Sequence, residues 1–450
     1  MRRRVANRRP FDRRGRYGGN RRTSRKAHLP RPVGDSGAPA VSWRRDPLVI
    51  SVNALGITQI TAWGTSYYCL GVLAKPIAAE TGWTISTIFL GFSVALVTMG
   101  LISTWVGRLI DRIGARAVMS IGTIIVSVGL LGLSQVRDVA SYFVAWLVIG
   151  IGMRCCLYDA AFAALVQAVP SRGRAAISYL TLYGAYASTV FWVIGHYLNT
   201  AYGWRGTLLI FAAINLGVCL PLNWLGLSRR ETATETVAAK APERTQDGPA
   251  LEGRMRTVGI ALFALIMSLN GFVFGVVSLQ LVPLLEAAGL AGATAVWVAS
   301  LKGHGQFGGR LVEIFFGKNL KAMTVARIAI GVLPPALLLL MLARGEFWLL
   351  VTFTLLLGAS QGVITIVRGA VPLALFGAQG YGAVLGLIAT PILLVNAFSP
   401  ALFALIVDQV GWQNALHALL ACAILTWVAI ELMSRWYESA RMGKTQNVSL

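Results

Sequence analysis

Four polar residues recur along one apolar segment, residues 292–314: Lys302, Gln306, Arg310 and Glu313. If the segment is a helix, their spacings of four, four and three place them on one face. Charged side chains inside a membrane cost about 2.5–3.5 kcal/mol each, so they usually face a cavity or a partner. The stripe therefore predicts a water-lined path. Arg310 suits an anion there because a guanidinium offers a carboxylate two parallel donors.

A second charged pair, Arg154 and Asp159, lies in another apolar segment, 140–168. Residues five apart on a helix point about 140° apart, so we expect the two side chains to engage different neighbours rather than each other. One hypothesis is that each forms half of an interhelical ion pair. The other is that Arg154 adds positive potential to a substrate cavity and Asp159 takes up a co-transported proton.

Gln59, Trp63 and Tyr67 lie four residues apart in the first apolar segment and share a helical face. Such a stripe forms either ordinary packing or a cavity wall against the carbon skeleton of a substrate. Asn270 is a further candidate to line the cavity, and so are Gln361 and Asn396. Arg368 is expected to extend toward the membrane surface.

The composition requires a membrane to hold these segments. Of the 450 residues 56% are apolar and only 13% are charged, and the mean hydropathy is +0.66. The apolar runs are too long and continuous for a β-barrel, and each fits a helix of roughly 20 residues across the bilayer. The predicted spans are 48–73, 84–106, 117–135, 140–168, 175–198 and 204–226, then 257–284, 292–314, 322–343, 346–371, 381–407 and 412–434. The fold class is thus an all-α membrane protein of twelve transmembrane helices in two pseudo-symmetric six-helix bundles.

More than half of the net positive charge is concentrated at the start of the chain. Residues 1–46 hold 15 lysines and arginines against three acids, so they carry +12 of the net +22. We expect a disordered basic cytoplasmic tail near anionic lipid headgroups. The alternatives are a mis-assigned start codon, which leaves open whether the tail is translated in the native protein, and RNA binding, which we do not favour because nothing folded accompanies the arginines. We do not interpret the tail as a cleavable signal peptide, because no short apolar core with a small-residue cleavage site follows its charges before the first long span.

The expected domains follow from these segments: bundles at 47–226 and 257–436, a cytoplasmic linker at 227–256 and a cytoplasmic C-terminal tail at 437–450. Outside the first 46 residues, sixteen basic residues fall in loops on one side of the membrane and four on the other. Basic residues are retained in the cytoplasm, so both termini are predicted to be cytoplasmic.

Other chemistries find little support. The five cysteines show no metal or disulfide spacing, and no phosphate-binding G-x-x-x-x-G-K-[ST] motif is present. No nucleophile and base stand at a catalytic spacing. We therefore expect no metal, no cofactor, no nucleic-acid partner and no enzyme activity.

Three segments carry a family resemblance. GRLIDRIGAR at 107–116 resembles the motif G-x-x-x-D-R-x-G-x-[RK] between spans two and three of the major facilitator superfamily. SYYCLGVLAKPIAAETGW at 66–83 and GWRGTLLI at 203–210 resemble its monocarboxylate transporter and oxalate/formate antiporter branch. GRLID at 107–111 is also echoed by GRLVE at 309–313, as expected of parallel repeats.

The resemblance implies a monomeric transporter that works by alternating access in a bacterial cytoplasmic (inner) membrane. Asp111 would engage charges or a helix N-terminus across the bundle interface when the cytoplasmic side is closed. Arg112 and Arg116 would hold the loop and lipid headgroups, while Gly107 and Gly114 would permit close approach and a tight turn. Arg310 has two alternatives: a gating arginine paired with Glu313, or the substrate-binding arginine of the eighth span, which we favour.

The sequence therefore predicts a secondary transporter for a small organic anion, favouring a monocarboxylate, driven by proton symport or by exchange with a counter-substrate. Arg310, Lys302, Gln306, Arg154, Trp63, Tyr67, Gln59 and Asn270 are the predicted substrate-binding residues, and Asp159 and Glu313 the predicted proton-coupling residues. One alternative is an exporter of a drug-like or metalloid solute. Another is a transporter-like membrane sensor or scaffold.

Overall fold

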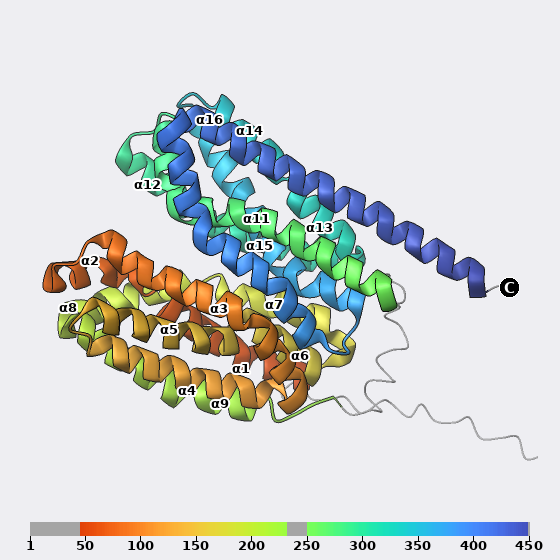
Figure 1. The fold of residues 1–450 in the computed structure, drawn as a ribbon, viewed down its shortest axis with the longest axis horizontal. Coiled ribbons are helices and arrows are strands. Elements are labelled where there is room, and N and C mark those ends of the chain that lie inside the picture. Colours follow the sequence, from red (N-terminus) through yellow and green to blue (C-terminus); the bar gives the residue numbers. More distant parts are fainter. Residues whose placement is uncertain (1–45, 232–249, 449–450) are drawn as a thin grey trace, which may run out of the picture. The chain divides into compact units, whose positions relative to one another are not determined.

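The computed structural model describes residues 46–231 and 250–448, and all of them are helical or lie in short connections. The first half contains α1 (Pro47–Ala62), η2 (Trp63–Tyr67), α2 (Leu70–Thr81), α3 (Ile85–Ile113), α4 (Ala115–Ser134), α5 (Val139–Cys156), α6 (Tyr158–Ala168), η3 (Pro170–Arg172), α7 (Gly173–Gly184), α8 (Ala187–Ile214), η4 (Asn215–Cys219) and α9 (Leu220–Gly226). The second half contains α11 (Gly253–Ala287), α12 (Gly292–Phe316), η5 (Gly317–Asn319), α13 (Ala322–Gly331), α14 (Leu333–Leu342), α15 (Phe347–Phe376) and α16 (Tyr381–Val448). Figure 1 shows each half as a group of adjacent helices.

Two glycines divide the longest helical stretches into pairs of spans. Gly203 has φ 69° and Gly411 has φ 79°, a left-handed backbone that favours glycine, and each is followed by a tryptophan. Eight stretches in the described chain are long and apolar enough to cross a membrane, and two of them, Pro170–Gly226 and Tyr381–Ser439, have 57 and 59 residues. Each of these two is long enough for two spans.

The remaining two spans are the first and the eighth. The first, residues 47–81, is interrupted by the π-helical turn η2, and the eighth, α12, carries the polar stripe. With them the count is twelve, so the all-α, twelve-helix prediction is confirmed. Large apolar side chains such as Trp105, Val193 and Leu432 are exposed on the outside, where lipid would cover them.

The predicted domain limits remain predictions. The basic tail lies outside the described residues except for Asp46, as does most of the predicted linker. The last helix continues to Val448, beyond the limit of 436 expected for the second bundle.

Short polar residues fix where several helices begin. Asp46, Thr84 and Asp138 each accept a hydrogen bond from a backbone N–H in the first turn of α1, α3 and α5. At its other end α3 stops at Gly114, which has φ 88°. The Gln167 side chain stabilises the α3–α4 turn because it accepts from Ala115 N (2.9 Å) and donates to Ile110 O (3.2 Å).

The two halves meet closely at the end that carries the α3–α4 turn, called the closed end below. Asp111 accepts hydrogen bonds from Gly382 N (2.9 Å) and Ala383 N (2.7 Å), at the first residues of α16. Arg174, at the start of α7, donates to Gly317 O (3.1 Å) and Leu320 O (2.7 Å), at the end of α12 and the turn after it. A carboxylate is favoured at a helix N-terminus and a guanidinium at a C-terminus. Both contacts therefore stabilise closure at this end.

At each end of the first half, an arginine forms hydrogen bonds that connect segments of that half. At the end opposite the closed end, Arg205 donates to Glu80 (2.8 Å), Ser134 O (2.7 Å) and Val136 O (2.9 Å), which joins α8 to the end of α2 and to the α4–α5 connection. At the closed end Arg172 forms two hydrogen bonds to Asp46 (2.8 and 2.7 Å). The Arg172 guanidinium lowers the pKa of the Asp46 carboxyl below its ordinary value.

Candidate functional site

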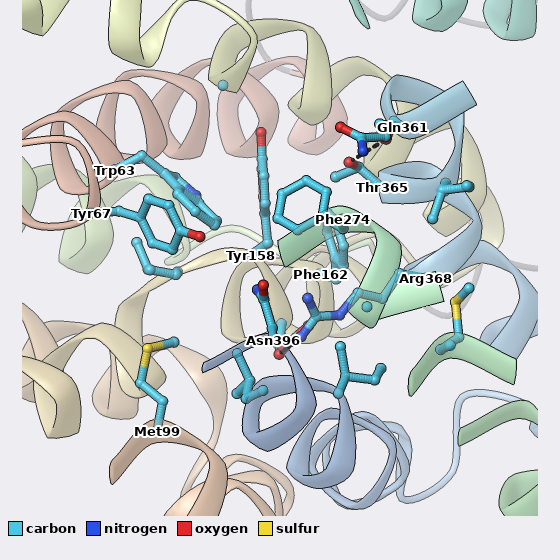
Figure 2. Close-up of a pocket in the computed structure, with 18 of the residues that line it drawn as sticks. Trp63, Tyr67, Met99, Tyr158, Phe162, Phe274, Gln361, Thr365, Arg368 and Asn396 are labelled. Atoms are coloured by element: carbon cyan, nitrogen blue, oxygen red, sulfur yellow. Dashed lines mark hydrogen bonds and ion pairs between the residues drawn. The ribbon is translucent and has the colours of Figure 1, made fainter. Parts of the chain in front are cut away.

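A cavity of about 140 Å³ lies between the two halves, deep in the spans. Its aromatic wall comes mainly from the first half: Trp63, Tyr67 and Tyr68 from the first span, Tyr158 and Phe162 from α6, with Phe274 added from α11. Figure 2 shows Trp63 and Tyr67 on one side of the cavity and Gln361 and Arg368 on the other, with Tyr158 between them. A cavity with an apolar wall and a few polar groups is typical of a small-molecule site.

The aromatic wall is held by contacts within the first half. Trp63 packs 4.8 Å from Tyr67 and 5.1 Å from Tyr158, measured between ring centroids. Its indole N–H donates to Gln59 (3.2 Å), and the Gln59 amide donates to Cys156 O (2.8 Å). Gln59 is therefore buried behind the wall and is not among the residues that line the cavity. Its side chain contacts Trp63 instead of facing the cavity.

Arg310 lines the cavity and is only 4% exposed. Its guanidinium donates to Thr181 O (2.6 Å) across the bundle interface and to Gly362 O (3.4 Å). Within the described residues no carboxylate lies within 4.0 Å of it. The alternative that pairs Arg310 with Glu313, which the sequence did not favour, is wrong: Glu313 lies 3.6 Å from Arg174 instead. The carbonyl dipoles hold the guanidinium in place but leave its net charge uncompensated.

Three charged groups meet at one carboxylate oxygen in the cavity. Asp159 Oδ2 lies 3.2 Å from Arg154 Nη1 and 2.7 Å from Arg368 Nη2. The expectation that Arg154 and Asp159 point apart is wrong, because the helix breaks between them at Leu157, whose backbone is extended (ψ −169°). Arg368 does not extend toward the membrane surface as expected, because it reaches across to Asp159. The spacing of residues around Arg368 in the sequence did not indicate its contact with Asp159.

Some of the other predicted polar residues line the cavity and others do not. Gln306 and Asn270 line the cavity, as do Gln361 and Asn396. Lys302 and Glu313 do not line it. The Lys302 ammonium lies 5.6 Å from the ring centroid of Phe274, one turn along α12 from Gln306.

Four buried polar atoms of the cavity wall have no hydrogen-bond partner among the described residues: Arg154 Nη2, Asp159 Oδ1, Tyr158 Oη and Gln361 Oε1. Unpartnered buried polar atoms are costly, so native proteins satisfy them with water or a ligand. Donors and acceptors are both represented, which fits a polar group of a cargo or ordered water. In the described part of the chain no cluster of three histidines, cysteines or acids gathers to hold a metal ion.

The predicted gating residues lie at the closed end. Gly107 faces the backbone of Gly382 and Ala383, and Gly114 forms the turn after α3. The Arg116 guanidinium lies 4.0 Å from the ring centroid of Trp224, which fixes the start of α4. Arg112 is exposed in the last turn of α3.

The family model described as Major Facilitator Superfamily matches residues 56–334. The chain belongs to this superfamily. It is a multi-pass membrane protein.

Similarity to individual proteins of the superfamily is lower. The chain is 26% identical over 169 residues to the multidrug resistance protein MdtL of Shewanella sp. (strain ANA-3), which is 37% of this chain and 42% of the relative. It is 24% identical over 215 residues to the uncharacterized MFS-type transporter YcxA of Bacillus subtilis (strain 168), 45% of this chain and 49% of the relative. The chain thus matches about half the length of these relatives. They do not confirm the monocarboxylate or oxalate/formate branch.

Solved structures share the fold. The human organic anion transporter MFSD10 superposes with a TM-score of 0.67 at 17% identity, covering 86% of this chain and 100% of that one. FucP in the outward conformation superposes with a TM-score of 0.65 at 13% identity, covering 86% and 99%. At these identities the likeness shows the fold alone.

Proposed function

We propose that this protein is a secondary transporter rather than an enzyme, and that it moves a small organic anion across the bacterial inner membrane by alternating access. The observation that carries the proposal is the Arg310 guanidinium, which is buried in the cavity and has no carboxylate partner among residues 46–231 and 250–448. An uncompensated buried charge is costly, and an anionic cargo would offset that cost each time it binds. Counting Arg154, Arg368 and Asp159, the cavity holds three guanidiniums and one carboxylate.

The aromatic wall adds a second requirement. Trp63, Tyr67 and Tyr158 face the cavity from the first half, while Arg310 and Arg368 face it from the second. The cargo's anionic group would lie toward the second half and its carbon skeleton against the aromatic rings. A monocarboxylate with an apolar body fits this division, with Gln306 and Asn270 as further hydrogen-bonding groups.

Energy for transport would come from a proton or from exchange. Asp159 is the proposed proton carrier because it is a carboxyl group in the cavity wall, and one of its oxygens has no hydrogen-bond partner in the part of the chain that the structure describes. Glu313, buried beside Arg174, is the second candidate. The excess of basic residues in the loops at the closed end supports a cytoplasmic location for that end, with both termini on the same side. On this orientation the structure is closed on the cytoplasmic side.

A drug-like solute is the second candidate cargo. The resemblance to multidrug resistance protein MdtL favours it, and so does the aromatic wall. A lipophilic cation would have to bind beside Arg310 and Arg368, and like charges in a low-dielectric cavity repel strongly. We therefore place the organic anion first.

The test is uptake into proteoliposomes that contain the full chain, with an imposed pH gradient and, separately, in counterflow. The panel consists of small monocarboxylates, their neutral amides and one lipophilic cation. Arg310→Gln removes the charge, and Lys75→Gln is the matched control because Lys75 is exposed and outside the cavity.

A charge-assisted hydrogen bond contributes about 1.5–3 kcal/mol, so Arg310→Gln should weaken uptake of the anion roughly 10- to 150-fold. Size-exclusion chromatography establishes that the variant is folded. Uptake of the cation but of no carboxylate by the unaltered protein would overturn the anion proposal in favour of the drug-like solute.

A further inference from the structure

One carboxylate in the cavity stands where a cargo's carboxylate would be expected. Asp159 Oδ2 lies 2.7 Å from Arg368 Nη2 and 3.2 Å from Arg154 Nη1. Asp159 and Arg154 belong to the first half of the chain, and Arg368 belongs to the second. The contact between Asp159 and Arg368 is therefore an ion pair between the bundles.

The Arg154 contact is of a different kind because both partners move with the same bundle. Arg154 is 2% exposed and its Nε donates to Ser103 Oγ (2.6 Å), so the guanidinium is fixed within the first half. Asp159 can lose Arg368 and still keep Arg154. A buried carboxylate that retains one guanidinium avoids most of the cost of an isolated charge.

The surrounding packing shows that the ion pair cannot survive opening of the closed end. Gly369, next to Arg368, packs so closely on the first half that a Cβ there would lie 2.8 Å from the Phe162 ring and 3.2 Å from Ile177 Cγ2. Ile177 is fully buried. When the bundles separate here, Arg368 must leave Asp159, and its charge needs another partner.

We propose that Asp159 is a built-in competitor for the anion site, and that the cargo's anionic group takes over Arg368 and thereby releases the closed end. This inference rests on the proposed function, because it assumes that the cargo is an anion. Arg368 is then a substrate-recognition residue, and Asp159 sets the requirement that the cargo be charged. A neutral analogue of the same shape binds the aromatic wall but leaves the ion pair intact.

The experiment measures how fast a cysteine at position 177 reacts with a maleimide in the detergent-solubilised full chain. Ile177→Cys places the thiol inside the closed contact. The unaltered chain, labelled in parallel, corrects for the native cysteines, of which Cys69, Cys155, Cys156 and Cys219 are buried. Asp159→Asn and Arg368→Gln each remove the ion pair. Asp408→Asn is the matched control because Asp408 is exposed.

Without cargo, both cavity variants should label at least about tenfold faster than the Ile177→Cys protein, because a loss of ~1.4 kcal/mol already changes an equilibrium tenfold. Asp408→Asn should change nothing. A transported carboxylate should accelerate labelling in the protein that retains Asp159, whereas its amide should not. In Asp159→Asn the carboxylate should bind at a lower concentration and add little further acceleration.

The labelling and transport results together distinguish failure of the ion-pair inference from failure of the anion assignment. Unchanged labelling in both Asp159→Asn and Arg368→Gln, with both variants folded, overturns the inference even if carboxylates are transported. If no carboxylate is transported but both variants label faster, the ion pair holds the closed end and the anion assignment fails, which also removes the cargo's part in the inference. Equal acceleration by the carboxylate and its amide contradicts the competition for Arg368.

Discussion

Adding one methyl group at Gly107 should prevent the closed end from closing. In the structure a Cβ on Gly107 would meet the carbonyl oxygen of Gly382 and lie 2.9 Å from its carbonyl carbon and 3.1 Å from Ala383 Cα. All three atoms belong to the backbone of α16, so no side chain can rotate away. Carbon atoms pack at about 3.5–4.0 Å, so the two helices would have to separate by roughly 0.6 Å or more.

The energetic cost follows from this overlap. Overpacking of a well-packed contact costs about 1–3 kcal/mol. Here the strain exists only in the closed arrangement, because Gly107 and Gly382 belong to different bundles. Gly107→Ala should therefore shift the equilibrium toward opening of this end by roughly 5- to 150-fold while leaving each bundle intact.

Pulsed electron paramagnetic resonance can measure the shift, with spin labels at the exposed positions Arg112 and Gln379, which lie on opposite bundles at the closed end. The distance distribution should move to longer values in Gly107→Ala. Gly132→Ala is the matched control, because its Cβ would meet only Ala145 Cβ at 3.9 Å, an ordinary contact. If both substitutions leave the distribution unchanged, the close approach of α3 and α16 does not control closure.

Three further outcomes follow from local geometry. Arg205→Gln should destabilise the first bundle by about 1–3 kcal/mol in thermal unfolding, because it leaves two carbonyls of the α4–α5 connection without their donor, while Arg137→Gln should have little effect since Arg137 is exposed. The pKa of Asp46 is lowered in the folded protein, so its contribution to stability is present above its unfolded pKa of about 3.9 and is lost as the pH falls below that value. Arg172→Gln should therefore reduce the fall in melting temperature between pH 7 and pH 3, and an unreduced fall would contradict this assignment. Gly411→Ala should lower the melting temperature, because φ is 79° there and a side chain costs roughly 1 kcal/mol in that conformation.

The twelve spans could be predicted because each depends on local composition. Long apolar runs must form helices in a bilayer whatever surrounds them. The ends of the helices were also close to expectation where a capping residue such as Asp138 or a glycine such as Gly203 marks them. The continuation of the last helix to Val448 could not be foreseen from hydropathy, since the segment is polar.

The site could be predicted only in part. Arg310, Trp63 and Asp159 line the cavity, and their type and position in a span were sufficient to single them out. The partners were not predictable. The contact of Arg154 with Asp159 depends on the break at Leu157, and the contact of Arg368 with Asp159 depends on how two distant helices are placed in space.

Four hydrogen bonds across the closed end, two accepted by Asp111 and two donated by Arg174, involve backbone atoms of the second half, and the ion pair of Arg174 with Glu313 adds a side chain. Asp111 binds N–H groups of Gly382 and Ala383, and Arg174 binds the carbonyls of Gly317 and Leu320. In a deep mutational scan, positions 111 and 174 should therefore tolerate few substitutions, whereas 320 and 383 should tolerate many. The side chains at positions 320 and 383 can thus vary without loss of the hydrogen bonds by which the second half closes on the first.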